Sequence, residues 1–346
     1  MTQRAGLRNF ARRSSKFSLG PMTTPRDPHD LAIYVAWLSY IGGHTQAEIA
    51  ERLSLSRAKV HRLISEAHEA GFVHVFIDRS PQALVDQEDR LARAYSLSQC
   101  LLVPDVAAPG EPAGNTVAIG AAAARYVQKR LAAGDVRSLG VSWGRSLAEM
   151  TRQLPRESYP SLSIVSLMGS LTQQAAINPF DVVYRLAEIT GGQGFFVPVP
   201  FIADSVADRD VLLAQRSVVD ALTRARAVDL CVVGIAAMKP DQPIFRSERG
   251  LLPAGARDEL VAHGCVAEIV GHFLNADGGL VDHPINRRTI GLSFAELAER
   301  DVMAVVGGAD KAPAIRAVLK SGLVNRLIID APAANALEQQ DAVAAS

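Results

Sequence analysis

The sequence predicts an α/β protein in two parts, a small helical domain followed by a larger domain built around a parallel sheet. Two observations support this fold class. Beyond residue 96, short apolar runs alternate with amphipathic helical patterns, which is typical of parallel strands covered by helices on both faces. Before residue 80 helical patterns dominate, and a chain of 346 residues is long enough for two or more domains.

Residues 1–27 are expected to form a basic, disordered tail. They hold six Lys or Arg and one Asp, and no apolar run follows the cations, so they do not have the composition of a secretory signal. A solvated tail is the simpler interpretation. An arm that binds phosphates without sequence preference is the alternative.

Residues 28–79 are predicted to be a winged helix-turn-helix domain. Apolar residues at helical spacing from Leu31 to Leu38 predict a first helix, which two glycines end. Thr45 and Glu48 have the spacing of a capping box at the start of a second helix. The segment 72–77 is rich in β-branched and aromatic residues and is predicted to be the strand of a wing.

The third helix of this domain has the pattern of a helix that reads DNA. Ser56 can cap its first turn. Its inward face follows the helical period with Val60, Leu63, Ile64 and Ala67. The outward face then carries Arg57, Ala58, His61 and Arg62, with Lys59 on the flank. Such a helix fits the major groove, where Arg pairs with guanine. A helical hairpin with a basic surface is the alternative.

The distribution of charge supports a nucleic-acid partner for the N-terminal part alone. Residues 1–79 hold 11 Lys or Arg and 7 Asp or Glu, a net charge of +4, and the whole chain is neutral, so the remainder carries −4. The residues predicted to contact DNA are Thr45, Gln46, Ser56, Arg57, Ala58, Lys59, His61 and Arg62.

Residues 80–95 are predicted to be a linker helix, and residues 96–346 a domain that binds a small ligand. Continuous apolar strands are expected within 99–105, 138–143, 161–169, 193–200, 229–236, 301–308 and 325–331. Helical patterns alternate with these strands, which favours a Rossmann-like domain.

Two strand-to-helix junctions in the larger domain have the composition of an anion site. The first, 139–147, combines glycines and serines with Arg145 ahead of a helix, although a tight structural turn is the alternative. The second, 305–315, has two glycines followed by Lys311. Both would lie at the edge where open α/β sheets bind ligands. The predicted ligand contacts are Gly140, Ser142, Trp143, Gly144, Arg145, Ser146, Gly169, Asn178, Gly234, Asn275, Asp277, Gly307, Gly308 and Lys311. Asn178, Asn275 and Asp277 are alternatively turn or cap residues.

The sequence contains no recognisable catalytic or metal-binding set. Its histidines lack HExxH spacing, and no residue is predicted to be catalytic or to bind a metal or cofactor. Cys100, Cys231 and Cys265 lie in apolar runs without CxxC spacing, which indicates buried free thiols in a reducing cytosol. No apolar run is long enough to span a membrane. A cytoplasmic protein is therefore expected.

Several segments together resemble the SorC-type family of sugar-responsive bacterial transcriptional regulators. They are "YVAWLSYIGGHTQAEIAERLSLSRAKVHRLISEAHEAGFV", "GVSWGRSL", "YRLAEITGG", "VVGIA", "NADGGLVDHPINRRTIGL" and "VVGGADKAPAIRAVLKSGLVNRLIID". The resemblance implies an effector domain related to sugar-phosphate isomerases and a homotetramer on palindromic operators. It also implies that the loop 140–146 holds the anionic or hydroxyl end of the effector, assisted by Lys311. Ser146 stands where such proteins commonly carry threonine, and it keeps the hydroxyl.

These observations predict a regulator that responds to a sugar, polyol or sugar phosphate and controls a carbohydrate uptake or catabolic operon. Its partners would be double-stranded operator DNA, the small effector and further copies of the chain. One alternative is a sugar-phosphate isomerase with a fused DNA-binding head. Another is an interaction protein whose N-terminal helices bind a protein partner. DNA binding should weaken steeply with salt, whereas the interaction protein should be insensitive to it.

Overall fold

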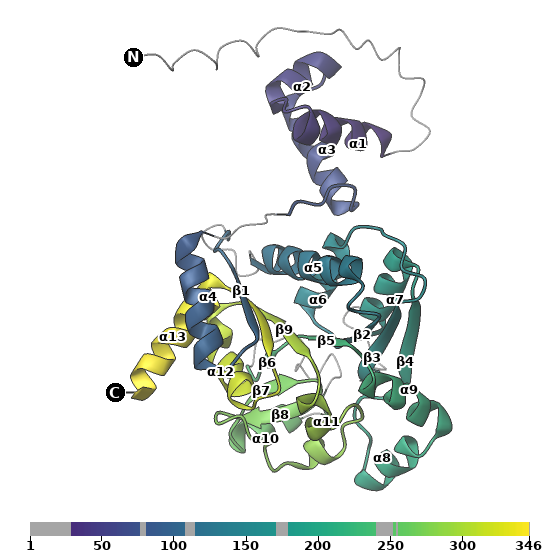
Figure 1. Ribbon diagram of the computed structural model, residues 1–346, viewed down its shortest axis with the longest axis vertical. Coiled ribbons are helices and arrows are strands. Elements are labelled where there is room, and N and C mark those ends of the chain that lie inside the picture. Colours follow the sequence, from purple (N-terminus) through teal and green to yellow (C-terminus); the bar gives the residue numbers. More distant parts are fainter. Residues whose placement is uncertain are drawn as a thin grey trace. The chain divides into compact units, whose positions relative to one another are not determined.

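The computed structural model describes residues 29–76, 81–107, 115–170, 179–239, 252–253 and 255–345. The chain divides into two compact units, one up to Val73 and one from His74 onward (Figure 1).

Three helices form the described part of the first unit. They are α1 (Asp30–Ala36), which continues into the π-helical turn η1 (Trp37–Ile41), α2 (Gln46–Leu53) and α3 (Arg57–Glu69). Both predicted caps are confirmed. Thr45 and Glu48 form a capping box, and the Ser56 hydroxyl accepts a hydrogen bond from the Lys59 N–H at 3.2 Å. The inward face of α3 is also confirmed, since Val60, Leu63 and Ala67 are buried and Ile64 packs against the same core.

The prediction of a strand at 72–77 is wrong for residues 72–76, which are not in a strand. Residue 77 lies outside the described residues. The reason is the lack of a pairing partner, because the other described elements of this unit are helices. The aromatic and apolar side chains pack individually instead. Phe72 stacks edge-on with His29 at 5.4 Å, and Val73 joins the helical core.

The second unit contains a seven-stranded parallel sheet in the order β1-β10-β9-β5-β2-β3-β4. Its strands are β1 (Gln99–Val103), β2 (Ser138–Val141), β3 (Ser163–Ser170), β4 (Gln193–Pro200), β5 (Leu230–Val233), β9 (Val302–Val306) and β10 (Arg326–Asp330). Each lies within a segment predicted to be a strand, except that β3 runs one residue past 161–169, so the α/β prediction is confirmed.

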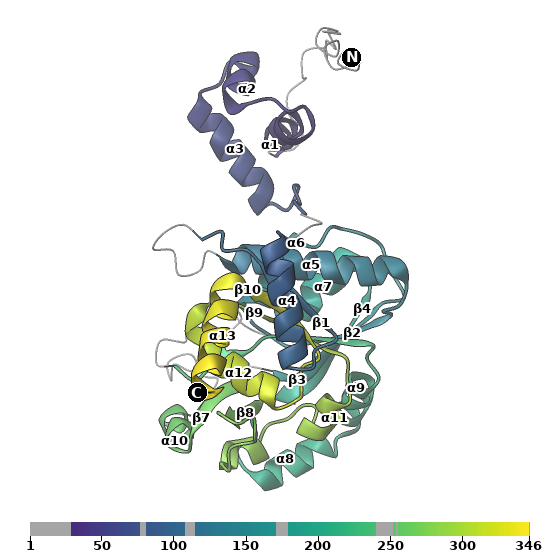
Figure 2. The same cartoon turned by 60° about the vertical axis from the view of Figure 1, so that its left-hand side comes forward.

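Helices cover both faces of this sheet, as Figures 1 and 2 show. One face packs against α5 (Asn115–Ala133), α6 (Arg145–Gln153) and α7 (Pro179–Thr190). The other packs against α4 (Gln82–Ala94), α9 (Arg216–Arg226), α12 (Ala312–Lys320) and α13 (Ala331–Ala345). Successive strand residues alternate between the two cores. In β5, for example, Leu230 and Val232 face the first group and Cys231 and Val233 the second.

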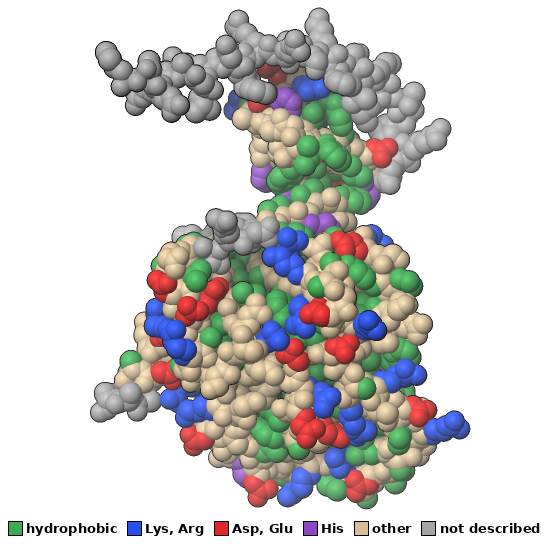
Figure 3. All heavy atoms as spheres, viewed as in Figure 1, with side chains coloured by type: hydrophobic (Ala, Val, Ile, Leu, Met, Phe, Trp, Pro, Cys, Tyr) green, Lys and Arg blue, Asp and Glu red, His purple; other side chains and the backbone are tan. Residues whose placement is uncertain are grey.

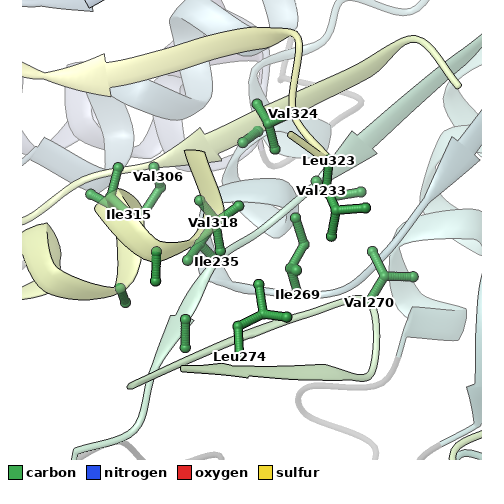
Figure 4. Close-up of a cluster of buried hydrophobic side chains, with 14 of the residues drawn as sticks. Val233, Ile235, Ile269, Val270, Leu274, Val306, Ile315, Val318, Leu323 and Val324 are labelled. Carbon is green, nitrogen blue, oxygen red and sulfur yellow. The ribbon is translucent and has the colours of Figure 1, made fainter. Parts of the chain in front are cut away.

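A small antiparallel sheet that the sequence did not predict lies beside α12. It consists of β6 (Ala236–Ala237), β7 (Cys265–Ile269) and β8 (His272–Asn275). Figure 4 shows Ile269 and Leu274 of this sheet in one apolar cluster with Ile315 and Val318 of α12. The remaining elements are α8 (Val206–Leu213), α10 (Ala256–Ala262), η5 (Pro284–Arg287), α11 (Phe294–Ala298) and η6 (Ala309–Lys311).

Candidate functional site

The N-terminal part of α3 presents an exposed cationic face. Arg57, Ala58, His61 and Arg62 are exposed, and Lys59 is half-buried on the flank. The acidic residues of α3, Glu66 and Glu69, lie in its last turns. A short turn with Ser54 in the left-handed conformation (φ 55°) separates α3 from α2. The first turns of α3 can therefore approach a polyanion without repulsion from acids on the same helix.

Thr45, Gln46 and Ser56, the other predicted DNA contacts, are also exposed. The hydroxyls of Thr45 and Ser56 cap α2 and α3, as described above. Residues at these helix starts are positioned to contact phosphates through backbone N–H groups and side chains. They remain predicted DNA contacts.

The larger unit reverses its strand order between β2 and β5. From β2 the chain moves outward through β3 and β4, whereas from β5 it moves the other way through β9 and β10. Ligands of open α/β sheets bind outside the carboxyl ends of the strands at such a reversal. The first junction follows β2, Gly234 follows β5, and the second junction follows β9, so all three lie at this edge.

The first junction leaves the start of α6 open. Gly144 is the N-cap, with φ 140°, and has no side chain to cap the helix. The first N–H groups of α6 lack partners within the helix, as at any helix start, and they favour an anion. The Ser142 hydroxyl is buried and accepts a hydrogen bond from the Gly234 N–H at 3.1 Å, which ties the loop after β2 to the loop after β5. Ser146 is half-buried in the first turn of α6.

The second junction is held by Asp330 at the end of β10. Its two carboxylate oxygens accept the Gly308 N–H at 3.0 and 3.1 Å, and one also accepts the Ala333 N–H at 3.1 Å. Asn115 donates to the same carboxylate at 3.1 Å. Gly308 has φ 103°, a conformation that side chains rarely adopt. The loop that carries Lys311 is therefore fixed in place.

Cations from both junctions converge. Burial lowers the pKa of the Lys311 amine, and the positive charge of Arg145 lowers it further, whereas the carboxylates of Asp310 and Asp330 raise it. Lys239, after β6, forms an ion pair with Asp310 at 3.3 Å. Figure 3 shows Lys and Arg interspersed with Asp and Glu over the visible face of this unit. The local cations, rather than a general positive field, would attract an anion here.

The structure gives other predicted ligand contacts different surroundings. Trp143 is 5% exposed and packs edge-on against Phe201, with ring centroids 6.4 Å apart. Gly140 and Gly169 are buried strand residues. A Cβ at either would lie 2.5 Å from a neighbouring atom, so close packing explains the glycines.

Asn275 and Asp277 are not brought to this edge. The Asn275 side chain accepts the N–H groups of Asp277 and Gly279, and Asp277 pairs with Lys320 at the C-terminal end of α12. Lys311 directly precedes the N-terminal end of this helix, and a helix of nine residues separates its two ends by about 13 Å. Asn178 lies outside the described residues.

Sequence reasoning missed Asn115, Lys239 and Asp330. A carboxylate at the end of the apolar run "LIID" was an available signal, because buried acids need several hydrogen-bond donors. Among the residues that the structure describes, no cluster of three His, Cys, Asp or Glu could hold a metal ion. None of the described helices is long and apolar enough to cross a membrane.

Two family models match the chain. One, described as "Putative sugar-binding domain", matches residues 79–337, and the other, "Winged helix-turn-helix DNA-binding", matches residues 42–74. This combination defines the class of DNA-binding transcriptional regulators with a sugar-binding domain. The chain belongs to the SorC-type family of these sugar-binding bacterial regulators.

Named relatives of the chain are transcriptional regulators. The "Erythritol catabolism regulatory protein EryD" of Brucella abortus (strain 2308) is 38% identical over 89% of this chain and 96% of its own length. The "Transcriptional regulator LsrR" of Escherichia coli (strain K12) is 30% identical over 88% of this chain and 92% of its own.

Solved structures share the fold. The full-length sorbitol operon regulator SorC from Klebsiella pneumoniae has a TM-score of 0.67 over 90% of this chain and 99% of its own. A DeoR family regulator from Listeria monocytogenes has a TM-score of 0.66 over 74% of this chain and 99% of its own. Their identities, 21% and 24%, show the fold alone.

Proposed function

We propose that the chain controls an operon for uptake or breakdown of a small polyol, and that the polyol or its phosphate binds at the sheet edge described above. The observation that carries this proposal is the convergence of Arg145 and Lys311 beside the open start of α6. The 38% identical relative named for erythritol catabolism supports a four-carbon polyol as the parent compound.

A phosphorylated effector fits the site better than the free polyol. A phosphate offers charge to two neighbouring cations whose mutual repulsion otherwise costs free energy, and it accepts the N–H groups of the first turn of α6. Burial and then the charge of Arg145 lower the pKa of Lys311, and a bound anion should raise it again. A neutral polyol would bind through hydroxyls alone, with Ser146 as a donor.

On the DNA side, we propose that the exposed face of α3 reads the operator. Arg57 and Arg62 would contact base edges, while the starts of α2 and α3 would contact phosphates. We also propose that the chain acts in the cytoplasm, without a cofactor, as a dimer or tetramer, because two-fold assemblies match palindromic operators. Light scattering on the full chain, alone and with operator DNA, tests the assembly.

The isomerase alternative requires a free base next to the ligand. Asp330 and Asp310, carboxylates that the described residues place at the second junction, are both engaged, the first by three donors and the second by Lys239. We therefore propose a sensor without catalysis. Isomerisation of any pentose, hexose or polyol phosphate by the purified chain would favour the enzyme.

A two-part experiment tests the proposed function. An operator fragment is first selected by the full chain from random DNA. Its dissociation constant is then measured by fluorescence anisotropy with erythritol, erythritol 4-phosphate or inorganic phosphate, and thermal melts report binding of each compound. We expect the polyol phosphate to stabilise the chain most and to change operator affinity. Equal melting temperatures with and without every compound would reject this effector class.

A further inference from the structure

The segment that leads out of the DNA-binding unit is anchored on the effector domain. Val73 packs in the core of the first unit, and His74, the next residue, belongs to the second. The imidazole Nδ1 of His74 lies 2.8 Å from the backbone carbonyl oxygen of Gln153, to which it can donate a hydrogen bond. The ring of Phe76 packs against the core beneath α5 and α6, with the guanidinium of Arg125 at 5.2 Å from its centre. We call residues 74–76 the strap.

The strap holds one end of the helix whose other end forms the proposed effector site. Gln153 is the last residue of α6, and Arg145 is the first. The last carbonyls of a helix have no partner within it, so the Gln153 oxygen is free to accept from His74. Nine residues of α helix separate the two ends by about 13 Å. The proposed effector loop therefore precedes the first residue of α6, and the strap contacts its last residue.

This helix is packed tightly along its length. Leu147, Met150 and Thr151 are fully buried along it. It also packs closely on α5, because a Cβ at Gly120 would lie 2.6 Å from the Glu149 side chain. Tightly packed interfaces of this kind shift between discrete arrangements rather than deforming gradually. A change at the first turn of α6 therefore reaches Gln153 with little loss.

We propose that α6 and the strap relay effector binding to the DNA-binding unit. When the first turn of α6 closes on an anion, the Gln153 carbonyl is displaced. This displacement alters the hydrogen bond to His74 and the packing of Phe76. The DNA-binding unit, which directly precedes these residues, then changes its range of orientations. This inference rests on the proposed function, since it assumes an effector at the start of α6. It adds the route by which that effector acts, and coupling between the two sites is what must be measured.

The test uses the full chain with His74→Ala and Phe76→Leu, and Val75→Ala as the control. Val75 is in the same strap but 51% exposed, so its loss leaves both anchors intact. For each chain, operator dissociation constants are measured with and without erythritol and erythritol 4-phosphate. Allosteric ratios are commonly about 5–150-fold. The ratio of the dissociation constants with and without effector should be the same in Val75→Ala as in the unsubstituted chain. In His74→Ala and Phe76→Leu it should fall toward one.

Thermal melts with the same compounds show whether each variant still binds the effector. A variant that still binds the effector but no longer changes its operator affinity supports the relay. A change in hydrogen exchange at residues 74–76 when effector is added supports it independently. A normal ratio in both His74→Ala and Phe76→Leu overturns the relay while leaving the proposed function in place. An unsubstituted chain that neither binds nor responds rejects the proposed function, and the relay falls with it.

Discussion

Replacing Asp330 with alanine should destabilise the effector domain and disable its ligand site together. The carboxylate is 2% exposed and accepts hydrogen bonds from Gly308, Ala333 and Asn115. Hydrogen bonds to a charged group contribute about 1.5–3 kcal/mol each, and a buried donor left without a partner costs about 1–3 kcal/mol. Asn115 keeps a second acceptor, Asp105, at 3.1 Å, so its loss is partial. Two full losses and one partial loss give about 3–7 kcal/mol.

Urea denaturation of Asp330→Ala and of the unsubstituted chain measures this difference. Asp310→Ala is the matched control on the same loop, because its carboxylate is largely exposed and its single ion pair with Lys239 is worth less than about 1 kcal/mol. Effector binding should weaken in Asp330→Ala even at temperatures where the domain is folded, because the loop before Lys311 loses its anchor. If the two variants unfold at the same urea concentration, the role assigned to Asp330 is wrong.

Burial raises the pKa of the Glu268 carboxyl in β7 to about 7, so the folded chain favours its protonated form. Its stabilising effect is complete below the ordinary value of 4.5 and is lost as the pH rises to about 7. Because Gln does not ionise, Glu268→Gln should lack this loss of roughly 3 kcal/mol in the free energy of unfolding. Parallel profiles of unfolding free energy for the two chains between pH 4.5 and 7 would contradict this role of Glu268. Arg57→Ala should cost about 1–3 kcal/mol at one operator position; an unchanged preference in a base-by-base competition assay rules out that contact. Lys311→Ala should leave operator binding intact and abolish the effector response, so a normal response in anisotropy removes it from the site. Ser146→Ala should weaken effector binding by about 1–3 kcal/mol if its hydroxyl bonds a charged group, and calorimetry that finds equal affinity excludes that bond.

The strands of the large sheet were predictable because each is short, apolar and bounded by turn residues. Leu230–Val233 is buried on both faces, and a short apolar run followed by Gly234 favours a buried strand over a helix. The small antiparallel sheet gave no comparable signal. β6 has two residues, too few for any period, and the hairpin between β7 and β8 turns at Val270 and Gly271 with φ of 48° and 82°, a conformation unusual for valine.

The candidate site was predictable only in its local parts. Glycines, serines and Arg145 lie together in the sequence, whereas the contact between Asn115 and Asp330 joins residues 215 positions apart. The positive charge of residues 1–79 does not come from the three-helix unit. Residues 28–79 hold five Lys or Arg and six Asp or Glu, so the excess of the N-terminal part comes from residues 1–27. Placement of cations on α3, rather than net charge, distinguishes the face proposed to read DNA.

The pairing of β1 with β10 sets the order in which the protein can be completed during synthesis. Gln99 and Arg326, partners across these strands, are 227 residues apart. A ribosome adding about 5–20 residues per second takes roughly 10–45 s to cover that distance. The three-helix unit ends at Val73 and needs none of that later chain for its own core. Nascent chains therefore carry a folded DNA-binding unit before β1 has its neighbour, and the sensor becomes available for control only when β10 emerges.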